Sequence, residues 1–239
     1  GKKEVDITAV QTILKIGALC NDAQFETTLK LKVIGDPTEA ALLVSAAKLG
    51  LERKKLSLEK HRLREIPFSS ERKRMTVMLH TGKKDLAYTK GAVGHLLHSC
   101  NKILWDGEVI ALTDKLCKEI IFAEENLAGE TLRVIGFAYK ELTGKEKKSE
   151  EIESGMIFAG MQAMKDPPRP EVKAALAECQ SAGIRVVMIT GDHLATAKAI
   201  AEELGITGEA ISGEELRKRD LNKLIDSVNI FARIDPEQK

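Results

Sequence analysis

Three consecutive polar residues, Thr190, Gly191 and Asp192, could hold a phosphate group. They follow an apolar run at 184–189, which is typical of a strand buried on both faces of a parallel sheet. Apolar residues at helical spacing come next and stop at Gly205. Ligands of open α/β sheets lie at the carboxyl ends of strands, and the first N–H groups of a helix suit an anion. The alternative is that Asp192 only caps this helix.

A second set of residues could bind a nucleotide. Phe68 and Lys73 precede one predicted strand, and Lys90 and Gly91 end the next. An exposed ring can stack on a base while two lysines neutralise phosphate. The alternative is a structural phenylalanine with two solvated lysines, and Gly91 permits either a close backbone approach to a ligand or a simple turn. Arg133 lies in a later apolar strand, where a lone arginine is usually an ion-pair partner.

The elements around these residues follow from periodicity. Alternating apolar residues between 66 and 90, broken by a turn at 81–84, predict an antiparallel pair of strands. Other segments predict helices at 7–20, 93–104 and 112–128, a hairpin turn at 105–108, a strand at 131–139, a polar loop at 144–155 and a strand at 156–164.

A helix is also predicted to begin at residue 37. Asp36 is its expected cap, Pro37 its first residue, and Glu39 the reciprocal partner in a capping box. These residues alone need no functional explanation.

Prolines at 167, 168 and 170 make a stiff connector, which predicts a domain boundary. Beyond it, a helix at 170–182 followed by strand, turn, helix and a last strand at 229–234 indicates βαβ topology. We therefore expect two domains, 1–165 and 166–239.

Composition excludes several classes of protein. The 239 residues are 43% hydrophobic and 31% charged with a net charge of +1, so nucleic acid is not an expected partner. The four cysteines lie far apart, which indicates neither a zinc site nor a disulfide framework. His95 and His98 are expected on a surface helix rather than as metal ligands. No apolar run is long enough to span a membrane, which indicates a soluble piece and leaves open what flanks it.

Taken together, several motifs resemble those of the P-type cation-transporting ATPases. They are Lys-Gly-Ala at 90–92, Asp-Pro-Pro-Arg at 166–169, Met-Ile-Thr-Gly-Asp at 188–192 and Phe-Ala-Arg at 231–233 with the Pro and Lys that follow. The runs at 35–42 and 67–75 look most like the calcium-pump branch. The resemblance implies an α/β chain: an α+β nucleotide-binding domain with an antiparallel sheet flanked by helices, then part of a Rossmann-like phosphorylation domain of the haloacid dehalogenase (HAD) type.

The resemblance also implies roles for individual residues. Phe68, Lys73 and Lys90, followed by Gly91, would form the ATP site. Glu39 would face the adenine end, and Arg133 would reach toward the phosphates. On the phosphorylation side the implied residues are Thr190, Gly191 and Asp192 in the phosphate loop, Asp166 at the hinge, and Arg233 and Lys239 near the phosphate.

This sequence departs from the family pattern in three places. The Asp-Lys-Thr-Gly-Thr run that carries the phosphorylated aspartate is absent, so we expect the chain to bind ATP without turnover. The run that helps to hold Mg²⁺ would follow Lys239, and no metal site is assigned within the chain. Calcium pumps commonly have an arginine at the position of Ser70, for which Arg72 is the alternative.

The resemblance thus implies the ATP-binding cytoplasmic portion of an ATP-driven cation pump that forms an aspartyl-phosphate. Its implied partners are ATP, Mg²⁺ and the actuator and transmembrane domains of a membrane protein, and calcium is the expected ion. The alternatives are another transported cation or a nucleotide-binding regulatory module without catalysis. A stand-alone phosphatase of the same fold would need an Asp-x-Asp motif, which the sequence lacks.

Overall fold

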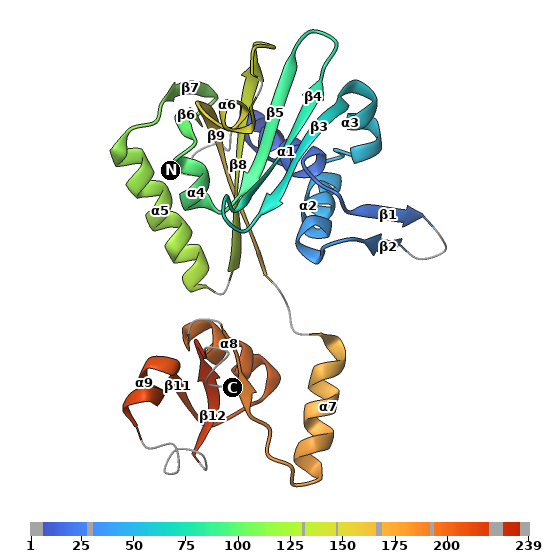
Figure 1. Cartoon of the computed structure of the whole chain (residues 1–239). Coiled ribbons are helices and arrows are strands. Elements are labelled where there is room, and N and C mark those ends of the chain that lie inside the picture. Colours follow the sequence, from blue (N-terminus) through green and yellow to red (C-terminus); the bar gives the residue numbers. More distant parts are fainter. Residues whose placement is uncertain are drawn as a thin grey trace. The chain divides into compact units, whose positions relative to one another are not determined.

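The computed structural model describes residues 7–27, 31–130, 132–146, 148–165, 169–191, 194–219 and 227–234 (Figure 1). Contacts divide the chain into two compact units. The first comprises Gly1–Glu125 and Val134–Met164, and the second comprises Asn126–Arg133 and Lys165–Lys239.

A seven-stranded sheet organises the first unit. Its strand order is β3-β4-β5-β8-β9-β6-β7. The pairs β3–β4, β4–β5, β5–β8 and β6–β7 are antiparallel, whereas β6 and β9 run parallel. The bounds are β3 His61–Ser69, β4 Arg74–His80, β5 Asp85–Gly91, β6 Cys100–Trp105, β7 Glu108–Ala111, β8 Leu132–Leu142 and β9 Met156–Lys165, and a separate antiparallel pair consists of β1 Gln24–Thr27 and β2 Leu31–Ile34.

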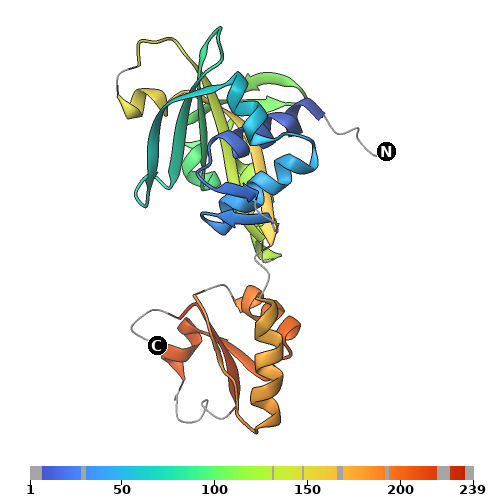
Figure 2. The ribbon, with the colours of Figure 1, turned by 90° about the vertical axis from the view of Figure 1, so that its right-hand side faces the viewer.

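Helices cover both faces of this sheet (Figures 1 and 2). On one face lie α1 (Ile7–Leu19), α2 (Pro37–Lys48) and α3 (Arg53–Glu59), and on the other lie α4 (Val93–Leu97) and α5 (Asp114–Gly129), with the short α6 (Ser149–Ile152) after β8. The alternation along β4 explains the two layers: Val77 belongs to the core under α1 and α2, and its neighbour Met78 packs against the core under α4 and α5. The predicted antiparallel pair of strands is confirmed in β4 and β5.

The second unit contains a three-stranded parallel sheet of order β10-β12-β11. Its elements are α7 Pro170–Ser181, β10 Met188–Ile189, α8 Leu194–Leu204, β11 Glu209–Ser212, α9 Gly213–Lys218 and β12 Val228–Ala232. Ala197 and Ala201 of α8 are fully buried in a core that includes Ile230 of β12. The chain is thus of mixed α/β class, with a mainly antiparallel sheet in one unit and a parallel sheet in the other.

Three predicted elements are wrong in part. Residues 100–105 form β6 rather than the second half of a helix, because their hydrogen bonds go to β7 and β9. The predicted loop at 144–155 contains α6. The buried strand expected at 184–189 is reduced to two residues, and the side chains of Ile184, Val187 and Ile189 are exposed.

Candidate functional site

The ends of β4 and β5 meet unusually closely at Gly91. A Cβ atom at this position would lie 2.5 Å from the carbonyl oxygen of Lys73 and 2.7 Å from the Cβ of Arg74. The amide of Ala92 donates to the same Lys73 carbonyl at 3.0 Å. The absence of a side chain at Gly91 therefore lets the end of β5 approach the start of β4 closely, and this contact fixes the position of the turn at Lys73.

Lys90 is buried beside this contact and pairs with Glu39. Its Nζ donates to Glu39 Oε1, and the two side chains are only 10% and 17% exposed. Glu39 Oε2 accepts from the amides of Asp22 and Ala23, both at 3.0 Å. The pair thus joins the start of α2 to the end of β5, and the structure brings together two residues that lie 51 positions apart in sequence.

The start of α2 confirms one half of the predicted capping box and corrects the other. Asp36 Oδ1 accepts from the amides of Thr38 and Glu39 at 2.8 and 3.2 Å, so Asp36 is the cap. The carboxylate of Glu39 instead accepts from the amides at 22–23 and from Lys90, whose buried ammonium would otherwise lack an anionic partner.

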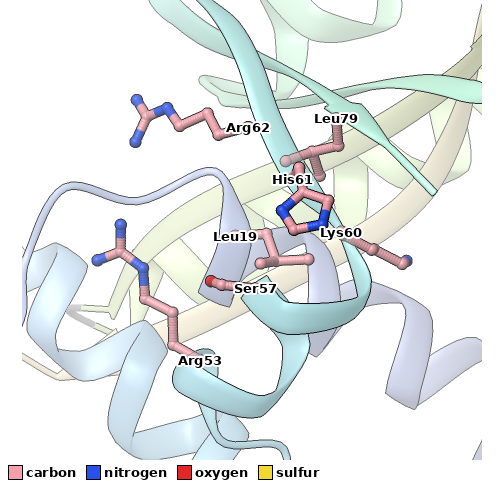
Figure 3. A pocket seen from close by; sticks show the side chains of 7 residues that line it. All are labelled: Leu19, Arg53, Ser57, Lys60, His61, Arg62 and Leu79. Carbon is pink, nitrogen blue, oxygen red and sulfur yellow. The ribbon is translucent and has the colours of Figure 1, made fainter. Parts of the chain in front are cut away.

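The turn at 22–23 is itself held by two arginines that line a pocket of about 220 Å³. Arg53 donates to the carbonyl of Ala23, and Arg62 pairs with Asp22 at 2.9 Å. Figure 3 shows both guanidinium groups extending to the same side of the pocket. Its lining consists of Leu19, Arg53, Ser57, Lys60, His61, Arg62 and Leu79. Arg62 also pairs with Glu65. The two arginines thus stabilise the turn at 22–23, whose amides donate to Glu39. None of the predicted nucleotide residues lines this pocket.

Phe68 and Lys73 lie on the hairpin that joins β3 to β4. Both side chains are exposed, and Phe68 is 62% exposed although it is an aromatic residue. Lys73 has a φ of 49°, and its amide donates to the Ser69 carbonyl at 2.7 Å. The hairpin therefore presents a ring and an ammonium group to solvent next to Gly91, so that Phe68, Lys73, Lys90, Gly91 and Glu39 belong to one end of the sheet.

Burial affects the ionisation of two cysteines in this unit. It raises the pKa of the Cys20 thiol to about 12, although the nearby charge of Lys90 opposes the shift. It also raises the pKa of the Cys100 thiol to about 12. Both side chains therefore remain protonated thiols at neutral pH and are poor nucleophiles.

The same hairpin rests on a buried carboxylate, Glu153, that sequence reasoning missed. Glu153 accepts hydrogen bonds from Arg72, Arg74 and Thr76. The suggestion that Arg72 takes the place of the arginine missing at Ser70 stays a prediction, and in this structure its guanidinium is engaged with Glu153 and the Pro67 carbonyl. Glu153 follows a charged run with no periodicity, so only its proximity to the apolar strand at 156–164 hinted at burial.

Arg133 stands apart from this cluster. It is exposed near the start of β8, three positions before Gly136, which pairs with Gly91 across β5 and β8. By its contacts Arg133 belongs to the second unit.

In the second unit the structure brings Thr190 and Arg233 together. The Thr190 amide donates to the Phe231 carbonyl at 2.9 Å, and the Ile234 amide donates to the Thr190 carbonyl at 3.1 Å. Thr190 and Gly191 follow β10 and Arg233 follows β12, so all three lie at the carboxyl end of the parallel sheet. Arg233 has a φ of 49°, in the left-handed region. Asp166, Asp192 and Lys239 lie outside the described residues.

Within the described ranges, no three His, Cys, Asp or Glu side chains gather in a way that could hold a metal ion. In the same part of the chain, none of the helices is both long and apolar enough to cross a membrane.

Comparison with known proteins gives matches along most of the chain. A family model described as P-type ATPase, cytoplasmic domain N, matches residues 9–171, and one for haloacid dehalogenase-like hydrolases matches residues 121–237. A calcium-transporting ATPase 1 of Bacillus cereus is 40% identical over 95% of this chain and 26% of its own length. A calcium-transporting ATPase of Bacillus subtilis is 37% identical over 100% of this chain and 28% of its own length.

A cation-transporting ATPase of Synechocystis, pma1, is 41% identical over 96% of this chain and 26% of its own length. The chain therefore spans about a quarter of the length of these relatives. Because the domain N model matches well over half of the residues, the chain belongs to the P-type ATPase family and carries its cytoplasmic domain N.

Proposed function

We propose that this chain is the ATP-binding portion of a cation pump that cycles through an aspartyl-phosphate. The observation that carries the proposal is the arrangement of side chains at one end of the sheet in the first unit. There an exposed phenylalanine and a lysine stand on one hairpin, beside a buried lysine–glutamate pair, in a chain with the sequence of domain N.

Each group has a distinct task in this proposal. The ring of Phe68 stacks on adenine, which is favourable for an exposed aromatic surface. The exposed ammonium of Lys73 neutralises phosphate charge. Lys90 gives one of its three N–H donors to Glu39, so the pair offers the nucleotide both a donor and an acceptor at a poorly hydrated floor. Mg²⁺, when bound with ATP, neutralises further phosphate charge.

The second unit supplies the phosphate side of the proposal. Thr190, Gly191 and Arg233 lie where parallel α/β sheets bind ligands. Asp192, Asp166 and Lys239 are assigned there, and Arg133 toward the phosphates, from the family resemblance. We assign calcium as the transported ion of the whole protein from the runs at 35–42 and 67–75. The names of two Bacillus relatives support calcium, and that of the Synechocystis relative specifies no ion.

Titration of the 239-residue chain with ATP tests the nucleotide site. We expect a Kd of about 0.1–1 mM, because a few stacking and charge contacts must offset the loss of ligand freedom. NMR shifts should move at Phe68, Lys73 and Lys90. Phe68→Ala should weaken binding about fivefold or more. Its matched control is Phe122→Ala on α5, because Phe122 is 65% exposed against 62% for Phe68. Equal affinities in the two variants would sink the assignment.

The chain alone should not hydrolyse ATP, since the attacking carboxylate of the family is not in its sequence. Incubation with labelled ATP and Mg²⁺ should leave no acid-stable phosphoprotein. A label that survives acid and is released by hydroxylamine would reveal a nucleophile elsewhere in these residues.

A further inference from the structure

The buried carboxylate of Glu153 accepts hydrogen bonds from two arginines next to the hairpin that carries Phe68 and Lys73. Glu153 directly follows α6 in sequence, and its side chain is 1% exposed. Arg72 Nη1 donates to both carboxylate oxygens, at 2.7 and 2.9 Å, and Arg74 Nε donates to Oε2 at 2.8 Å. A carboxylate in so dry a place requires this dense set of donors.

Two threonines complete the network from the sheet side. Thr76 Oγ1 donates to Glu153 Oε1 at 2.7 Å and lies 2.8 Å from Thr89 Oγ1. A hydroxyl has a single proton, so when Thr76 donates to Glu153 it must accept from Thr89. The chain of hydrogen bonds therefore runs from β5 through β4 to Glu153, and it is fully directed.

Arg72 transmits this anchor to both sides of Phe68. Its Nη2 donates to the carbonyl of Pro67, and its own amide donates to Ser69 Oγ at 3.2 Å. The residues before and after Phe68 are thus both tied to Arg72, Pro67 through the guanidinium and Ser69 through the backbone amide. Glu153 accepts from the same guanidinium. With two arginines against one carboxylate, the network keeps a net charge of +1 below Lys73, which suits a polyanionic ligand.

We propose that Glu153 is a positioning residue for nucleotide binding, acting through Arg72 on the ring of Phe68. This inference rests on the proposed nucleotide site. Glu153 touches no ligand in this scheme; it holds the hairpin in the conformation that accepts the base, and so removes an ordering step from binding.

The test is a double-mutant cycle on ATP affinity in the 239-residue chain. Glu153→Gln keeps the size of the side chain and removes its charge, and we expect affinity to fall about fivefold to twentyfold. In the Phe68→Ala background the same substitution should change affinity less than about twofold, because its effect passes through the ring. Equal losses in both backgrounds would show general destabilisation and overturn the proposal.

Glu146→Gln is the matched control. Glu146 lies in the same segment, but its carboxylate accepts from Thr143 and faces Lys140 rather than the hairpin. It should leave ATP affinity unchanged. In NMR spectra Glu153→Gln should shift the backbone amides of residues 68–74, and Glu146→Gln should not. An equal loss of affinity in both variants would also overturn the proposal.

Arg72→Lys keeps the test open if Glu153→Gln fails to fold. Lysine retains a cationic partner for Glu153, but a single ammonium cannot reproduce the planar bridge to Pro67. We expect a smaller loss of affinity that again disappears in the Phe68→Ala background. If Phe68→Ala weakens ATP while neither Glu153→Gln nor Arg72→Lys does, the site stands and the positioning role falls. If the unaltered chain does not bind ATP, both proposals fail.

Discussion

Replacing Lys90 by methionine tests how the nucleotide end of the first unit is held together. Lys90→Met keeps an unbranched side chain and removes the charge that faces Glu39. The two side chains are nearly buried, so water cannot replace the lost partner. Breaking a buried ion pair from one side usually costs about 3–5 kcal/mol. Glu39 retains two amide donors, so we expect the free energy of unfolding to fall by about 2–3 kcal/mol.

The matched control is Lys84, which pairs with Glu141 at 2.5 Å while 49% of its side chain and 60% of that of Glu141 remain exposed. An ion pair in water contributes little, and Lys84→Met should change the free energy of unfolding by no more than about 0.5 kcal/mol.

Urea unfolding provides the measurement. Trp105 is the only tryptophan of the chain and lies on β6, so its fluorescence reports on the first unit. The double variant Lys90→Met with Glu39→Gln removes both charges, and its loss should be smaller than the sum of the single losses by about 1 kcal/mol or more. A loss for Lys90→Met no larger than for Lys84→Met, or strict additivity in the double variant, would refute the buried-pair reasoning.

Two other predictions concern packing and pH. Gly91→Ala should lower the free energy of unfolding by about 2 kcal/mol or more, because its Cβ would meet backbone at 2.5 Å. Gly94→Ala, whose nearest contact would be 3.7 Å, should not, and equal urea midpoints would contradict the argument. Burial raises the pKa values of Cys20 and Cys100 from 9.0 to about 12. Between pH 9 and 12 the folded chain therefore binds more protons than the unfolded chain does. The free energy of unfolding should then fall as the pH rises through this range. Cys20→Ala should flatten that slope, and an unchanged slope would argue against a buried thiol.

Local patterns predicted those parts of the fold that depend on neighbours in sequence. The alternation at Met75, Val77 and Leu79 predicted β4 correctly, because every second side chain enters the same core. Asp36 and Pro37 predicted the start of α2 correctly, because a helix cap acts on amides within three residues of it. Residues 100–104 were mistaken for helix although one of their partners, β7, is local; the other, β9, lies more than 50 positions later and gives no local signal.

The candidate site divides in the same way. Phe68, Lys73 and Lys90 could be proposed from sequence, since residue type and strand position suggested their chemistry. The pairing of Lys90 with Glu39 and the burial of Glu153 could not, because each depends on donors brought in from distant strands. A local capping pattern even suggested a different role for Glu39, and the stronger long-range ion pair prevailed.

The distance along the chain between Arg72 and Glu153, 81 residues, sets an order in which the hairpin can mature. The strands β3, β4 and β5 are consecutive and close short loops, so they can pair early. Glu153, the carboxylate partner of Arg72, follows β8 and α6 in sequence. During synthesis the hairpin therefore emerges well before its anchor, and ATP-binding competence should be among the last properties that this unit acquires as it folds.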